Sequence, residues 1–125
     1  MEDISPRGRR HLGARQETLA ISYLAQQGLH LIERNYQCRL GELDLIMGDG
    51  DQLVFVEVRY RKDRRFGRPV ETVDYRKQRK LLLCARHYLM CRQLTESVSC
   101  RFDVLGITGD GPAQYCWVRD AFQLA

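Results

Sequence analysis

Apolar residues recur at helical spacing in two stretches of the chain, one near the N-terminus and one past the middle. The first stretch predicts a helix over residues 11–27, ended by Gly28. Its apolar stripe is Leu12, Leu19, Ala20, Tyr23 and Leu24. The second stretch predicts a helix over residues 73–92, with Thr72 as a candidate N-cap. Its stripe is Val73, Leu81, Cys84, Tyr88 and Cys91.

Between and after these stretches the pattern changes to short apolar runs that are typical of strands. These runs are residues 29–39, 41–46, 54–59, 98–108 and 115–118, and a short helix or tail follows the last one. The order α-β-β-β-α-β-β predicts an α/β protein: a mixed sheet of about five strands with one helix against each face. A chain of 125 residues forms one such domain. We expect it over residues 11–125, after a flexible N-terminal arm over residues 1–10.

Two of the strand-like runs carry carboxylates inside otherwise apolar sequence. Residues 41–46 and 54–59 flank a Gly/Asp cluster that is typical of a hairpin turn. If the strands pair symmetrically about that turn, Asp44 faces Glu57 and Glu42 faces Arg59. Facing residues have Cβ atoms about 4.5–5.5 Å apart. Two carboxylates that close repel each other unless a proton or a cation lies between them, and a divalent metal ion meets that need.

The same carboxylates have a second interpretation, as members of a buried ion-pair network with Arg59, Arg61 or Lys77. Buried ion pairs seldom add stability, which favours the metal site. Glu17 lies at the edge of the first helix stripe, so it is either a surface acid or a third acid of the site. Lys77 projects into the second stripe. It either extends along the sheet edge to water or points at the carboxylate pair.

Positive charge is concentrated in one segment of the chain. The formal net charge is +4, whereas residues 59–80 hold ten bases and three acids, a net +7. A basic segment beside a carboxylate pair favours a nucleic-acid partner over a merely solvated surface. The residues that we expect to contact nucleic acid are Arg59, Arg61, Arg64, Arg65, Arg68, Lys77 and Lys80.

Composition excludes several other classes of protein. The hydrophobic share of 44% and charged share of 29% are ordinary for a soluble globular protein. We expect no membrane contact, because no apolar run approaches the roughly 20 residues of a membrane span, and no signal peptide is apparent. The five cysteines are odd in number and widely spaced, which argues against a disulfide framework or a zinc site and favours a cytoplasmic location.

The full set of motifs closely resembles the YraN family of small bacterial proteins, which are similar to archaeal Holliday-junction resolvases. The resemblance runs from about residue 13 to 122. Its motifs are Gly13-x3-Glu17-x2-Ala20-x2-Tyr23-Leu24, Arg34-Asn35-Tyr36, residues 41–46, residues 54–61, Phe66-Gly67, Lys77 and residues 101–104. It implies a three-layer α/β/α restriction-endonuclease-like core. Resolvases of this fold act as dimers, so the resemblance also suggests a homodimer.

The resemblance further implies that Asp44 and Glu57 bind Mg²⁺ or Mn²⁺, and that Glu17 is the helix-borne acid. Arg59 stands where these nucleases usually have lysine. An arginine stays charged and only donates hydrogen bonds, so Arg59 either clamps a phosphate oxygen while Lys77 takes the lysine's role, or pairs with Glu42.

Three hypotheses follow. The first is a metal-dependent DNA endonuclease that hydrolyses phosphodiesters, with branched DNA as a candidate substrate; its catalytic set is Glu17, Asp44, Glu57, Arg59 and Lys77. The second is a catalytically inactive nucleic-acid-binding module of the same fold. The third is a protein-interaction module whose basic face meets an acidic partner.

Overall fold

The computed structural model describes residues 6–62, 72–94, 97–109 and 112–123. Its elements are α1 (Pro6–Gln26), β1 (His30–Cys38), β2 (Gly41–Asp49), β3 (Gln52–Arg61), α2 (Tyr75–Cys91), β4 (Ser99–Thr108) and β5 (Gln114–Phe122). Their order confirms the α-β-β-β-α-β-β prediction. No helix of the described ranges is both long and apolar enough to cross a lipid bilayer.

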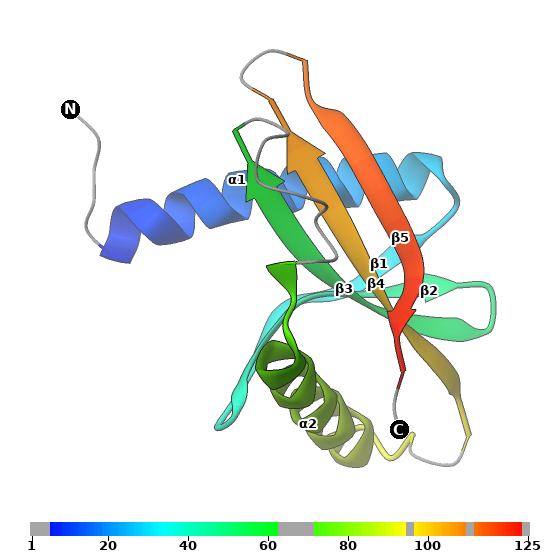
Figure 1. Cartoon of the computed structure of the whole chain (residues 1–125). Helices are drawn as coiled ribbons and strands as arrows, with labels where there is room; N and C mark the ends of the chain where they lie inside the picture. The colour runs from blue at the N-terminus through cyan, green and yellow to red at the C-terminus, as the bar shows by residue number, and fades with distance from the viewer. Residues whose placement is uncertain (1–5, 63–71, 95–96, 110–111, 124–125) are drawn as a thin grey trace.

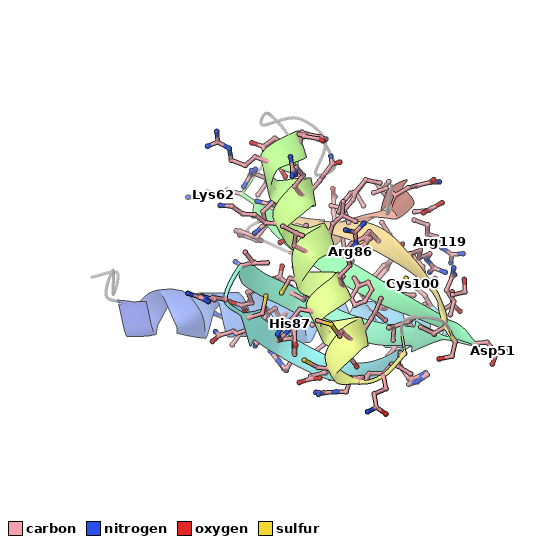
Figure 2. The ribbon with its side chains drawn as sticks, turned by 90° about the horizontal axis from the view of Figure 1, so that it is seen from below. Asp51, Lys62, Arg86, His87, Cys100 and Arg119 are labelled. Atoms are coloured by element: carbon pink, nitrogen blue, oxygen red, sulfur yellow. The ribbon has the colours of Figure 1, made fainter. Side chains whose placement is uncertain are left out.

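The five strands form one mixed sheet in the order β1-β2-β3-β4-β5. Neighbouring strands are antiparallel except β3 and β4, which run parallel and are joined by the crossover that contains α2. Helices α1 and α2 lie on opposite faces of the sheet (Figure 1), and α2 runs across its face in the rotated view (Figure 2). The predicted three-layer α/β/α architecture, with a helix on each face, is confirmed.

Each helix packs on its own apolar layer because successive side chains of a strand point to opposite faces. Val54 and Val56 of β3 pack with Ala20 and Leu24 of α1. Phe55 of β3 packs with the α2 side instead, where the buried helix residues are Leu81, Cys84, Ala85, Tyr88 and Leu89. The prediction that Leu19 and Cys91 belong to the buried helix stripes is wrong, because both residues are exposed.

The β2–β3 hairpin has the predicted register. Leu45 pairs with Val56 and Asp49 pairs with Gln52. This is the symmetric pairing about the turn that predicts Asp44 opposite Glu57. The two-residue loop begins at Gly50, whose φ of 60° favours glycine.

The helix ends differ in detail from the prediction. Helix α1 begins at Pro6 rather than at residue 11, so residues 6–10 of the expected arm are helical, and residues 1–5 lie outside the described ranges. It ends as predicted before Gly28, whose φ is 101°. The N-cap of α2 is Asp74 rather than Thr72, because the Asp74 carboxylate accepts a hydrogen bond from the Lys77 amide at 2.8 Å.

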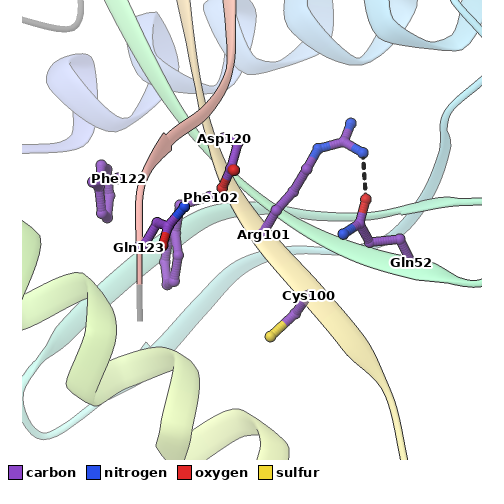
Figure 3. A pocket seen from close by; sticks show the side chains of 7 residues that line it. All are labelled: Gln52, Cys100, Arg101, Phe102, Asp120, Phe122 and Gln123. Carbon is purple, nitrogen blue, oxygen red and sulfur yellow. Dashed lines mark hydrogen bonds between the residues drawn. The ribbon is translucent and has the colours of Figure 1, made fainter. Parts of the chain in front are cut away.

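The sheet is braced at its hairpin end by a buried carboxylate. Asp103 has no exposed surface. It accepts hydrogen bonds from Arg101 at 3.0 Å, the Trp117 indole at 2.9 Å and the Asp120 amide at 2.9 Å. Arg101 also donates to Gln52 at 2.6 Å, beside a cavity of about 430 Å³ (Figure 3). Strand β5 continues to Phe122, through residues for which the sequence predicts a short helix or tail.

Candidate active site

Strand β2 separates from β3 at Asp44. The ladder between the two strands reaches only to Leu45 and Val56, and beyond it the Val58 amide donates to the Asp44 carboxylate at 2.9 Å. The Asp44 carboxylate therefore accepts the hydrogen bond that a backbone carbonyl of β2 would accept if the ladder continued. The side-chain pattern breaks at the same point, because Leu43 packs on the α2 face whereas Leu45 packs on the α1 face. This irregularity brings the Asp44 carboxylate against β3.

Glu57, on β3, belongs to a cluster of acids with Asp44, Glu17 and Glu42, and it is the most deeply buried of the four. Its residue exposure is only 7%, and it follows Phe55 on the α2 face. The pKa of Glu57 is raised to about 9, chiefly by burial and next by the negative charge of Asp44 and a hydrogen bond with Asp44, while Lys77 and Arg59 lower it only in part. At neutral pH a proton therefore holds the two carboxyl groups together. The predicted approach of Asp44 to Glu57 is confirmed.

Glu17 enters the cluster from α1 and is 8% exposed. Arg34 of β1 lies 3.5 Å from its carboxylate and also donates to the Ala14 carbonyl at 3.0 Å, which ties the helix to the strand. Burial and then the charge of Asp44 raise the pKa of Glu17, while hydrogen bonds from Asn35 and Arg34 lower it. The interpretation of Glu17 as a surface acid is wrong.

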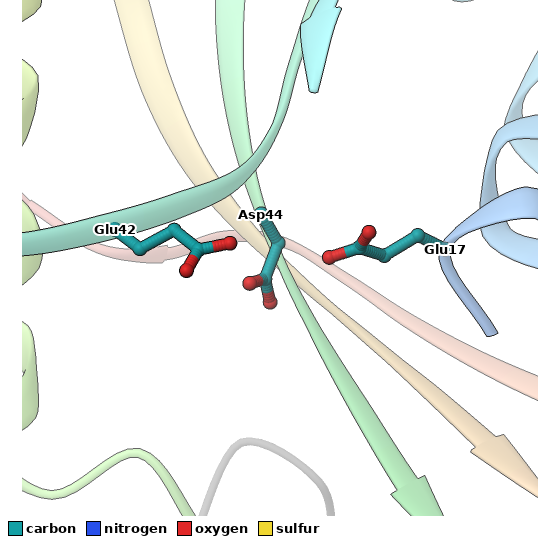
Figure 4. Close-up of side chains that lie close together, drawn as sticks. All are labelled: Glu17, Glu42 and Asp44. Carbon is teal, nitrogen blue, oxygen red and sulfur yellow. The ribbon is translucent and has the colours of Figure 1, made fainter. Parts of the chain in front are cut away.

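Glu42 completes the cluster from the open end of β2. Carboxylate oxygens of Glu17, Glu42 and Asp44 all lie within 4.8 Å of one another. In Figure 4, Glu17 and Glu42 point toward Asp44 from opposite sides. The expected cross-strand pair of Glu42 with Arg59 is not formed, because the ladder between β2 and β3 ends at Leu45 and Val56.

Two cations approach the cluster on the α2 face. The Lys77 ammonium lies 3.9 Å from Glu57 Oε2, so the expectation that Lys77 points at the carboxylate pair is confirmed. Its side chain keeps 41% of its surface exposed and so also reaches solvent. Arg59 follows Glu57 on the same face of β3. The buried Arg59 Nε has no hydrogen-bond partner in the described part of the chain.

The other residues predicted to bind nucleic acid are Arg61, Lys80 and three arginines. Arg61 ends β3, where its guanidinium donates to the Tyr60 carbonyl at 3.0 Å, and Lys80 is exposed on the first half of α2. The other three residues predicted to bind nucleic acid lie outside the described ranges: Arg64, Arg65 and Arg68. The described bases therefore lie on the two elements that also present Glu57 and Lys77.

Comparison with known proteins places this arrangement in a family. The model of Uncharacterised protein family UPF0102 matches residues 16–107, which include all the acids of the cluster. The chain belongs to the UPF0102 (YraN) family. It is 46% identical to a UPF0102 protein of Nitrosococcus oceani, over 97% of this chain and 98% of that one. A UPF0102 protein of Chromohalobacter salexigens is 50% identical over 90% and 91% of the two chains.

Among solved structures, the chain is similar to Pyrococcus furiosus SfsA in complex with Ca²⁺. The TM-score is 0.39 and the sequence identity 14%, over 88% of this UPF0102 chain and 63% of the SfsA chain.

Three residues of the UPF0102 cluster were not predicted as site residues. The sequence predicts that Glu42 faces Arg59. The signal that favours a place in the site is that Glu42 lies two residues before Asp44, because such residues of a strand point to the same face. The sequence marks Arg34 and Asn35 only as part of a family motif. Asn35 has φ 57°, a left-handed conformation that asparagine tolerates better than most residues, and it hydrogen-bonds Glu17.

The donor set of the UPF0102 cluster fits a hard divalent cation. Glu17, Glu42, Asp44 and Glu57 offer only carboxylate oxygens, the ligands that Mg²⁺ and Mn²⁺ prefer. Glu57 Oε2 is buried and has no hydrogen-bond partner in the described part of the chain. Buried polar atoms are normally paired, so this oxygen is one that a cation would satisfy.

Proposed function

We propose that this chain is a metal-dependent endonuclease that binds DNA and hydrolyses its phosphodiester bonds, with branched DNA as one substrate class. The observation that carries the proposal is Oε2 of Glu57, which is buried beside the Asp44 carboxylate without a hydrogen-bond partner in the described part of the chain and has only the Lys77 ammonium, 3.9 Å away, as an ionic partner there. Burying two acids side by side costs stability, and a site that takes up a cation gives a reason for that cost.

In this proposal Asp44 and Glu57 hold Mg²⁺ or Mn²⁺, and Glu17 assists directly or through water. The bound ion supplies a water of lowered pKa and neutralises charge on the phosphate. Arg34 and Asn35 keep the Glu17 carboxylate turned toward Asp44 through their hydrogen bonds. The Val58 amide holds Asp44 in place with its 2.9 Å hydrogen bond.

The cations of the α2 face bind the substrate. Lys77 reaches from Glu57 to solvent, so its ammonium can contact a phosphate oxygen beside the carboxylates. Arg59 follows Glu57 on the same face of β3, and its guanidinium is proposed to bind the same phosphate. Arg61 and Lys80 bind neighbouring phosphates, and Arg64, Arg65 and Arg68 are proposed to do the same. Such contacts predict affinity that falls steeply with salt concentration.

The test is calorimetric titration of Mg²⁺ and Mn²⁺ into the wild-type chain, followed by cleavage assays on branched, single-stranded and duplex DNA. The informative variant is Asp44→Asn, because asparagine keeps an oxygen for the Val58 amide but removes the charge. Asp51→Asn is the matched control, since Asp51 is an exposed acid in the hairpin loop. We expect binding and cleavage in wild type and control, and neither in Asp44→Asn. Equal metal binding by all three proteins would refute the site.

A second candidate is a nucleic-acid-binding module without catalysis, and Arg59 favours it. Its guanidinium cannot give up a proton, so it cannot replace a lysine that does so. This candidate predicts salt-sensitive DNA binding that persists in Asp44→Asn, with no cleavage by any variant. A homodimer stays a prediction, which sedimentation of the chain with and without branched DNA checks.

A further inference from the structure

Two cysteine thiols meet where the β1–β2 hairpin touches α2. The Sγ atoms of Cys38, at the end of β1, and Cys84, in the middle of α2, are 2.9 Å apart. A disulfide bond is about 2.05 Å long, so the sulfurs need to approach by less than about 1 Å. The two residues are 46 positions apart in the chain, and tertiary packing alone brings them together.

The surroundings give the two thiols different roles. Cys38 is partly exposed, whereas Cys84 has no exposed surface. Burial opposes ionisation of Cys38, but hydrogen bonds with the Cys84 thiol and with the Leu40 and Gly41 backbone outweigh it and lower its pKa. Burial and then the hydrogen bond to Cys38 raise the pKa of Cys84 to about 12. The more accessible sulfur is therefore the better nucleophile.

We propose that Cys38 and Cys84 form a peroxide-reactive thiol pair. The Cys38 thiolate attacks one oxygen of hydrogen peroxide, the O–O bond breaks, and hydroxide leaves, which makes Cys38 a sulfenic acid. The Cys84 thiol then loses its proton and attacks the Cys38 sulfur. The S–S bond forms as the S–O bond breaks, and the departing hydroxide takes the proton as water. Two thiols are oxidised, and one peroxide is reduced to two waters.

The disulfide ties the β1–β2 hairpin to α2 at a defined place. The chain between the two cysteines contains Asp44, Glu57 and Lys77, so the cross-link closes a loop around most of the acid cluster. The chemistry of the pair does not depend on the proposed metal site, because neither sulfur belongs to the cluster of acids. The nearby Cys91 is exposed and lies 3.8 Å from the His87 ring, and it takes no part in the reaction.

The experiment treats the reduced full-length chain with one equivalent of hydrogen peroxide, alkylates the remaining thiols and maps the linked peptides by mass spectrometry. We expect a Cys38–Cys84 linkage in wild type. In Cys84→Ala, which keeps the attacking thiol, dimedone should trap a sulfenic acid at Cys38. Cys38→Ser should give neither product. Cys116→Ser, which removes an exposed thiol on β5, should form the linkage as wild type does.

Thermal unfolding gives a second readout that does not depend on the variants folding equally well. Oxidised wild type should unfold on the order of 10 °C above the reduced chain, and dithiothreitol should reverse the change. The proposal is overturned if the dominant linkage joins Cys38 to Cys91, or if wild type accumulates sulfenic acid at Cys38 without any disulfide.

Discussion

The raised pKa of Glu57 makes the stability of the metal-free chain depend on pH. Its pKa is about 9 in the folded chain and 4.5 as an ordinary glutamate, chiefly because the side chain is buried and next because Asp44 lies beside it. Between these values the folded chain holds a proton that the unfolded chain releases. The stabilising contribution is therefore complete below pH 4.5 and is lost as the pH rises toward 9.

The size of this effect follows from the width of the pKa shift. One pH unit inside the window corresponds to about 1.4 kcal/mol for one proton. From pH 5.5 to pH 7.5, Glu57 should lower the free energy of unfolding by roughly 3 kcal/mol. Glutamine resembles the protonated side chain and does not titrate. Glu57→Gln should therefore gain roughly 3 kcal/mol on wild type over this range.

Urea denaturation followed by circular dichroism, with a chelator present, measures the free energy of unfolding at pH 5.5, 6.5 and 7.5. The difference between wild type and Glu57→Gln should grow steadily with pH. Asp51→Asn removes an exposed acid and should follow the wild-type slope. Parallel pH profiles for wild type and Glu57→Gln would show that Glu57 is not held protonated, and the account of the cluster would be wrong.

Three further substitutions separate structural from functional roles. Asp44→Ala leaves the Val58 amide without its partner and should cost about 1–2 kcal/mol of stability in urea denaturation, whereas Asp44→Asn should cost less. Lys77→Gln should change stability by less than about 1 kcal/mol, because the side chain is 41% exposed, yet weaken DNA binding in a salt-dependent titration. Asp103→Ala removes the buried partner of Arg101 and should cost about 3–5 kcal/mol in the same denaturation assay.

The hairpin register could be predicted because two physical constraints agree there. The turn residues around Gly50 limit where the chain reverses, and burial of alternate residues limits the pairing. Together they place Asp44 beside Glu57. The position of Glu42 could not be predicted in this way. It depends on β2 leaving β3 at Asp44, and no local pattern marks that separation.

The helix details show the same limit. Thr72 and Asp74 are both good N-caps, and local sequence does not decide between them. Leu19 is exposed and Glu17 is buried, the reverse of what their polarity favours. Burial of Glu17 depends on Arg34, a residue of another element. The approach of Cys38 to Cys84 likewise arises only when β1 and α2 pack together.

The separation of β2 from β3 beyond Leu45 has a consequence for how a large ligand can approach. Among the described residues, no strand pairs with the second half of β3 on that side, so the acid cluster lies beside an unpaired strand edge. A bulky polymer can then approach without any strand being displaced. For the proposed cleavage reaction, we therefore expect the backbone of the sheet to stay rigid.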